Sequence, residues 1–188
     1  METAILCGGS GKRMGGVNKG RLKLCGEDFV EILYRRFSRV GRVFVVGREE
    51  EFPEYESYSD AISGVGPLGG ILKALEVASS EKVLVVPCDT PLFSVESAEY
   101  LLKLSDEFEI VAFHLEKITP IPGVYSRSLA SDLERFLRSG GRSITSFLLT
   151  RRSLLVYPRS WKSLKGVNTP RDYEELLKTV ECGGEKNV

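Results

Sequence analysis

The sequence predicts an α/β protein: a three-layer α/β/α sandwich with a mostly parallel sheet, forming a Rossmann-like nucleotide-binding domain. Short runs rich in β-branched residues alternate with segments whose apolar residues recur at helical spacing. The strand-like runs are apolar on both faces, which is typical of central strands in a parallel sheet. The length of 188 residues suits one compact core. We therefore expect a single domain over residues 1–180 and a frayed tail over 181–188.

Five segments have the composition of strands, being short and dominated by Val, Ile, Leu and Phe. They are residues 3–7, 42–47, 82–89, 109–113 and 153–158. The stretch 114–126 contains two prolines, so we expect it to be irregular, with a strand-like end.

The segments between these strands have helical patterns. Residues 28–40, for example, place Phe29, Leu33 and Phe37 on one face. The expected helices are residues 28–40, 66–80, 94–104, 128–138 and a last one that begins at Thr169 and ends near residue 180. Ser94 is expected to cap the third helix, and Thr169, Pro170 and Asp172 form a capping-box pattern at the start of the last.

Composition restricts the possible partners. Lys plus Arg number 26, as do Asp plus Glu, so a broad nucleic-acid or membrane-binding surface is not indicated. The hydrophobic fraction of 42% is typical of a folded soluble protein. No apolar run reaches the roughly 20 residues that span a bilayer, and no signal-peptide pattern is seen. We therefore expect a cytoplasmic protein.

The cysteines give no metal or redox motif. Cys7, Cys25, Cys88 and Cys182 include no C-x-x-C pair. We expect them to be buried and reduced. The sequence has no glutamine and only three asparagines, which is typical of hyperthermophile proteins.

Three motifs follow expected strands: the glycine-rich loop after residue 7, "PCDTP" at 87–91 and "NTP" at 168–170. In open α/β sheets, ligands bind beyond the carboxyl ends of the strands. The sequence therefore predicts one composite site built from these three segments.

The glycine-rich stretch "AILCGGSGKRMGGVNKG", residues 4–20, fits neither standard phosphate-binding fingerprint. For a P-loop, Arg13 stands where Ser or Thr is required, and for a dinucleotide fingerprint, Met14 stands at the third glycine. Gly8 and Gly9 can still let an anion or a base approach backbone N–H groups. Arg13 and Lys19 could hold phosphates. The alternative is a plain strand–helix turn with solvated basic residues.

Two carboxylates are candidate site residues. Asp89 follows the third strand directly and is a candidate Mg²⁺ ligand; the alternative is a turn or cap aspartate. Asp60 precedes the glycine-rich stretch 63–70, whose backbone could approach a flat base while Asp60 binds a ribose hydroxyl. The alternative for Asp60 is a surface turn.

The remaining candidates are weaker. His114, the single histidine, has no identifiable partner and is expected to be structural. Arg35, Arg36, Arg151 and Arg152 are expected to be solvated, and an anionic second substrate could bind at Arg142, Arg151 or Arg152.

These motifs together resemble the molybdenum cofactor guanylyltransferases. The first loop alone is similar to nucleotidyltransferases with a glycosyltransferase-A-like fold. The combination is more specific: "LCGGSGKRMGGVNKG", "GPLGGI", "PCDTPLF" and "VNTPRD" occur in the family's order and spacing. The resemblance runs from Ile5 to about Leu177.

The resemblance implies a reaction and a set of roles. GMP would pass from GTP to the terminal phosphate of Mo-molybdopterin, with release of pyrophosphate. Asp89 would bind Mg²⁺, and Asn168 would lie near the metal and the second substrate. The catalytic residues would be Arg13, Lys19 and Asp89. The nucleotide-binding residues would be Leu6, Cys7, Gly8, Gly9, Arg13, Lys19, Asp60, Gly66, Pro67, Leu68 and Asp89. The implied partners are GTP, the molybdopterin cofactor and molybdoenzyme-maturation proteins.

Two positions depart from the family pattern: Cys7 replaces the usual Ala, and Gly166 stands where Asn is frequent. Three alternative functions remain open. They are a cytidylyltransferase for the same cofactor, a guanylyltransferase for a cobinamide phosphate, and a non-catalytic nucleotide-binding module.

Overall fold

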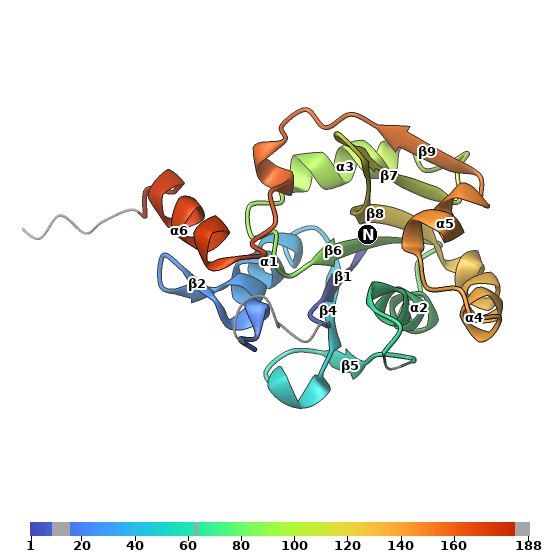
Figure 1. The fold of residues 1–188 in the computed structure, drawn as a ribbon, viewed down its shortest axis with the longest axis horizontal. Helices are drawn as coiled ribbons and strands as arrows, with labels where there is room; N and C mark the ends of the chain where they lie inside the picture. The colour runs from blue at the N-terminus through green and yellow to red at the C-terminus, as the bar shows by residue number, and fades with distance from the viewer. Residues whose placement is uncertain (9–15, 63, 183–188) are drawn as a thin grey trace, which may run out of the picture.

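The computed structural model describes residues 1–8, 16–62 and 64–182. A seven-stranded sheet in the order β5–β4–β1–β6–β8–β7–β9 forms its centre, with helices on both faces (Figure 1). Within this seven-stranded sheet of the described residues, β8 runs antiparallel to the other six strands, which are parallel to one another. The strands are β1 (Glu2–Leu6), β4 (Arg42–Gly47), β5 (Ser57–Ser59), β6 (Lys82–Pro87), β7 (Ile110–His114), β8 (Ile118–Ser126) and β9 (Ser153–Val156). The predicted three-layer sandwich with a mostly parallel sheet is confirmed.

Alternating side chains of the strands supply the two halves of the core, as the period of two requires. Ala4 and Leu6 of β1 pack in the cluster that includes α2, whereas Ile5 packs in the cluster that includes α1. The helices are α1 (Phe29–Phe37), α2 (Pro67–Val77), α3 (Val95–Lys103), α4 (Ala130–Arg138), α5 (Ile144–Leu149) and α6 (Pro170–Thr179). Short 3₁₀ turns are η2 (Lys19–Arg21), η3 (Glu49–Glu51), η4 (Arg127–Leu129) and η5 (Lys162–Leu164).

The predicted helix starts are found. The hydroxyl of Ser94 accepts a hydrogen bond from the backbone N–H of Ser97 and caps α3. Thr169 and Asp172 form a reciprocal capping box at the start of α6, with Pro170 in its first turn. These caps fix where the chain turns from the carboxyl edge of the sheet into each helix.

The stretch 114–126 is more regular than we expected, because it contains the whole of β8. The two prolines do not disturb the central ladder. The pairing of β8 with β6 involves only Gly123 to Ser126, beyond both prolines. Its pairing with β7 shifts register between Ala112 and Phe113, so Pro120 and Pro122 fall in the irregular part. A proline lacks the N–H that an inner strand must donate, and this irregularity removes the conflict.

Helix α6 lies beside a small hairpin of β2 (Lys23–Leu24) and β3 (Glu27–Asp28) (Figure 1). The hairpin turn is Cys25–Gly26, and both residues have positive φ, as a two-residue turn of this kind requires. Leu24 of the hairpin and Leu176 of α6 share a small apolar cluster with α1. The Tyr173 hydroxyl also donates to the Lys23 carbonyl at 2.7 Å.

A disulfide joins Cys25 to Cys182, so the expectation of four reduced cysteines was wrong. The two cysteines are 157 residues apart, and only the docking of α6 on the hairpin brings them together. Disulfides are common in oxidising compartments and in intracellular proteins of hyperthermophiles. Cys7 and Cys88 are free and buried, as expected.

The helices in the described part of the chain are all too short or too polar to cross a membrane. Residues 183–188, which belong to the expected tail, lie outside the described ranges.

Candidate active site

The carboxyl ends of β1 and β6 lie next to each other and carry two of the predicted motifs. The two strands are parallel, with Leu6 opposite Pro87. The ladder continues one residue further, because Cys88 N–H donates to the Leu6 carbonyl at 2.9 Å. Gly8 and Asp89 therefore leave the sheet side by side, where the topology predicts a ligand site.

Lys19, Asp89 and Asn168 converge at this edge. The ammonium of Lys19 lies 2.8 Å from Oδ2 of Asp89 and 2.7 Å from Oδ1 of Asn168. The three residues come from three separate motifs, and the fold alone brings them together. The three segments therefore meet, as the strand topology predicts, and their joint role as a ligand site stays a prediction.

Local structure holds each member of this group. Lys19 begins η2, whose preceding residue Asn18 accepts a hydrogen bond from the Gly20 N–H at 2.9 Å. Asn168 precedes the cap of α6, and its backbone N–H donates to Asp172 at 3.0 Å. The Asp89 carbonyl accepts from the Val167 N–H at 2.8 Å, which joins the Asp89 and Asn168 segments.

Arg36 of α1 holds the segment after Asp89 by hydrogen bonds to its backbone. Its Nη1 donates to the carbonyls of Pro91 at 2.7 Å and Phe93 at 2.6 Å. Burial lowers the pKa of the Arg36 guanidinium. The expectation that Arg36 is solvated was wrong, because its side chain turns under this loop. Arg35 does lie at the surface, paired with Glu27.

Gly166 makes room for the converging side chains. A Cβ placed there would lie 3.2 Å from Nδ2 of Asn168 and 3.3 Å from Oδ1 of Asp89. The departure from the family pattern at this position therefore falls within the site itself.

Asp60 lies between the end of β1 and the start of α2. A Cβ on Gly8 would lie 3.2 Å from Oδ2 of Asp60, and one on Gly70 would lie 3.2 Å from Oδ1. Oδ1 is buried and has no hydrogen-bond partner within the described ranges. Burial raises the pKa of this carboxyl group. Asp60 is thus a partly buried residue rather than an exposed turn residue.

The loop before α2 presents backbone rather than side chains. Gly66 has φ of +67° and precedes Pro67 at the first position of α2. The side chain of Leu68 is buried in the core, as are those of Leu6 and Cys7. Any contact of these three residues with a ligand would use their backbone groups. The first turn of a helix leaves N–H groups free for such contacts.

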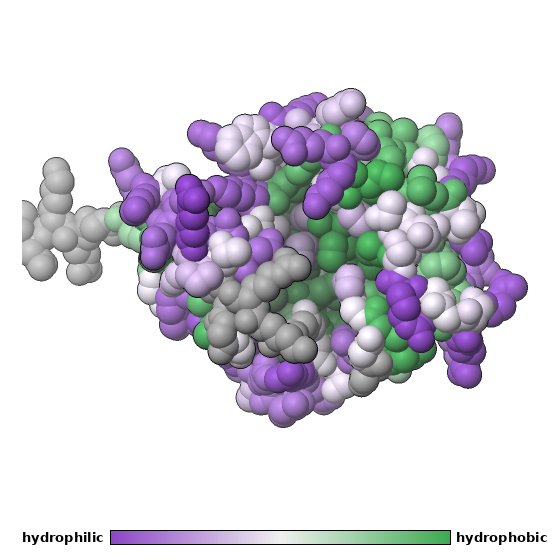
Figure 2. Space-filling view, in the orientation of Figure 1, coloured by the Kyte–Doolittle hydropathy of each residue, from purple (hydrophilic) through white to green (hydrophobic). Residues whose placement is uncertain are grey.

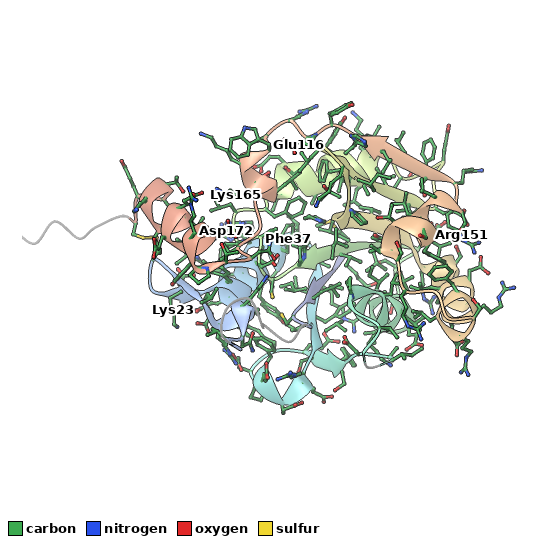
Figure 3. All side chains as sticks on the ribbon, in the orientation of Figure 1. Lys23, Phe37, Glu116, Arg151, Lys165 and Asp172 are labelled. Atoms are coloured by element: carbon green, nitrogen blue, oxygen red, sulfur yellow. A yellow bond between two sulfur atoms is a disulfide. The ribbon has the colours of Figure 1, made fainter. Side chains whose placement is uncertain are left out.

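The arginines suggested for a second substrate lie elsewhere. Arg142 donates to the carbonyls of Leu137 and Gly141 near the end of α4. Arg151 pairs with Asp132 at 2.5 Å, and Arg152 donates to the Glu107 carbonyl. Figure 3 shows Arg151 across the molecule from Asp172, which holds Asn168. Gly9 and Arg13 lie outside the described residues.

Two residues that hold these segments, Arg36 and Asp172, were not predicted to do so from the sequence. Arg36 lies beside Leu33 and Phe37, at the border of the apolar face of α1. This position was the one sign in the sequence that its side chain could be partly buried. Asp172 was identified as a cap, and its bond to Asn168 follows from that cap.

A bound cation would find oxygen donors here. The Lys19 ammonium already contacts one oxygen each of Asp89 and Asn168, so both face a common positive charge. Within the described residues, no group of three or more His, Cys, Asp or Glu could hold a metal by itself. Mg²⁺ needs only one or two carboxylates when a phosphate and water complete its shell. The donor set fits a metal that arrives with a nucleotide.

Comparison with known proteins identifies the family of the chain. Residues 3–153 match the family described as MobA-like NTP transferase domain. A probable molybdenum cofactor guanylyltransferase of Carboxydothermus hydrogenoformans is 32% identical, over 95% of both chains. A molybdenum cofactor guanylyltransferase of Mannheimia succiniciproducens is 35% identical, over 79% of this chain and 83% of its own.

A solved structure shows the same fold. Molybdopterin-guanine dinucleotide biosynthesis protein A from Archaeoglobus fulgidus superposes with a TM-score of 0.82 at 25% identity. The superposition covers 95% of this chain and 97% of the other.

Proposed function

Because the chain belongs to the MobA-like NTP transferase domain family, we propose that it transfers GMP from GTP to the terminal phosphate of molybdopterin and releases pyrophosphate. The names of the relatives, which are similar over most of their length, support this choice of donor and acceptor. We propose that residues 1–180 form the one domain that carries the activity.

The observation that carries this proposal is the meeting of Lys19, Asp89 and Asn168 at the carboxyl edge of the sheet. Transfer of a nucleotidyl group requires charge neutralisation and in-line positioning more than a protein nucleophile. The acceptor phosphate is itself the nucleophile. Its oxygen forms the new bond to the α-phosphorus as the bond to the β-phosphate oxygen breaks, and pyrophosphate leaves with the electron pair.

We assign the following roles to the chain. Lys19 moves from Asp89 to the phosphates and neutralises their charge. Asp89 and Asn168 hold Mg²⁺, which supplies further charge neutralisation when bound. Asp60 accepts a hydrogen bond from a ribose hydroxyl, and backbone groups of residues 66–68 contact the base. Arg13 is proposed as a second phosphate contact on the basis of sequence.

The test is pyrophosphate release with Mg²⁺ and molybdopterin, comparing GTP with CTP and ATP. We expect release with GTP and at least tenfold less with the other two. A preference for CTP would overturn the choice of guanine. Binding of GTP without pyrophosphate release in the presence of acceptor would overturn the assignment as an enzyme.

A further inference from the structure

An unassigned aromatic surface lies on the same edge of the sheet as Lys19, Asp89 and Asn168. It consists of His114 at the end of β7 and Tyr157 directly after β9. The strands are parallel, with Phe113 opposite Val156, so the next residues, His114 and Tyr157, are neighbours. Their ring centroids are 5.7 Å apart at an interplanar angle of 68°.

Tyr157 is unusually exposed for an aromatic residue. Its relative exposure is 74%, and that of Trp161 in the same segment is 61%. In the described part of the chain, these two are the only aromatic residues among the exposed large hydrophobic side chains. Single exposed apolar residues are ordinary, but aromatic exposure confined to one segment at a functional edge indicates a binding surface.

The segment that carries these residues leads into the site. The chain runs from Tyr157 through η5 to Asn168, which Figure 1 shows as the orange connection between β9 and α6. Leu164 in η5 is buried, and the Ser163 hydroxyl donates to the Ser160 carbonyl at 3.0 Å. The guanidinium of Arg159 lies 5.1 Å from the centre of the Tyr100 ring. The segment is therefore anchored while its tyrosine points into solvent.

The buried ring nitrogen of His114 makes no hydrogen bond within the described residues. Nδ1 is buried and has no hydrogen-bond partner in residues 1–8, 16–62 and 64–182. An unpaired buried polar atom costs stability. Such a cost is expected where a side chain serves binding rather than folding. The imidazole instead provides an edge-on support for the Tyr157 ring.

The spacing suits the proposed acceptor. β7 is two strands from β6, and β9 is three, so the aromatic surface lies roughly 10–15 Å from β6, the strand that leads to Asp89. The phosphate of molybdopterin and its fused rings are at opposite ends of one small molecule. Figure 2 shows a hollow near the middle of the molecule in this view, with hydrophobic residues beside it.

We propose that Tyr157, supported by His114, is the contact surface for the heteroaromatic ring system of the acceptor. This inference rests on the proposed function, because that function places the acceptor phosphate near Asn168. An aromatic side chain is suited to a fused heterocycle because stacking needs only a flat face and tolerates several ring substituents.

The test compares three variants in two assays. Tyr157→Ala removes the ring, and Tyr157→Phe keeps it. Leu149→Ala removes an exposed apolar side chain at the end of α5, the helix that precedes β9. KM for molybdopterin and for GTP is measured with the wild type and each variant. Binding of 6-hydroxymethylpterin phosphate is measured separately through the fluorescence of Trp161, the only tryptophan.

We expect Tyr157→Ala to raise KM for molybdopterin and Kd for the pterin about tenfold, by loss of stacking. KM for GTP and Tm should stay unchanged, and Tyr157→Phe and Leu149→Ala should stay within twofold of the wild type. Unchanged pterin binding in Tyr157→Ala, or equal losses for GTP and acceptor, would overturn the inference.

The two proposals can fail separately. If the wild type turns over GTP and molybdopterin and Tyr157→Ala does so equally well, only the aromatic surface is refuted. If the wild type releases no pyrophosphate, the proposed function is refuted, and the pterin-binding assay still decides the role of Tyr157.

Discussion

Lys19 forms an ion pair with Asp89 at 2.8 Å, and each partner is about one-fifth exposed. Without their ligands, a lysine that binds phosphates and a carboxylate that binds a metal would each lack an opposite charge nearby. Their ion pair keeps both charges compensated until the ligands arrive, so substitution of either residue also changes the environment of the other.

Lys19→Ala should weaken GTP binding about tenfold, because a charged phosphate contact is lost. Guanosine, which has no phosphate, should bind as it does to the wild type. Titration calorimetry with both ligands measures the difference. Lys23→Ala, which removes a nearby exposed lysine, is the matched control. Equal losses for GTP and guanosine would place Lys19 away from the phosphates.

Asp89→Ala should abolish the increase in GTP affinity that Mg²⁺ produces, while metal-free GTP binding is retained. The carboxylate that holds the metal is gone, and Lys19 is released to the phosphates. Mn²⁺ titrations followed by electron paramagnetic resonance give an independent readout. Asp106→Ala, at an exposed position in the turn after α3, should behave as the wild type. Full Mg²⁺-dependent turnover in Asp89→Ala would refute its role.

Asp60→Asn should raise the free energy of unfolding at pH 7. Burial raises the pKa of Asp60 above its ordinary value of 3.8, so the folded state holds this proton more tightly than the unfolded state. The wild type therefore loses stability as the pH rises from the ordinary pKa of 3.8 through the higher pKa of the folded state. Denaturation at several pH values should show the gain shrinking toward pH 4. The same variant should bind GTP more weakly, and a gain in both properties would contradict a ribose contact.

Arg36→Met should lower the free energy of unfolding by about 2 kcal/mol or more, because two buried carbonyls lose a charged donor. Arg35→Met, one residue earlier and exposed, should cost less than about 1 kcal/mol. Urea denaturation of both variants checks this pair. Similar small losses in both would show that Arg36 does not hold the loop.

Much of the sheet was predictable because its inner strands are apolar on both faces. The segment 42–47 matches β4 without change, and Ser94 and Thr169 cap their helices as expected. Parallel strands end at one edge, so the meeting of Lys19, Asp89 and Asn168 could also be predicted. Their motifs follow different expected strands, and the parallel topology places the ends of these strands at the same edge of the sheet.

Other contacts between distant segments could not be predicted. The two hydrogen bonds of Arg36 depend on how α1 lies beneath residues 91–93. The strand β8 was obscured by Pro120 and Pro122, whose tolerance depends on a register shift. The Cys25–Cys182 bond depends on the docking of α6 against a hairpin. No local pattern carries this information.

The disulfide also changes what a protease can do to this protein. It links positions 157 residues apart, so most of the backbone lies inside one covalent ring. A single cut in any surface loop between these cysteines leaves both pieces attached through sulfur, with the core still holding them in place. A nicked molecule should therefore run as two fragments on a denaturing gel only after a reductant has opened the ring.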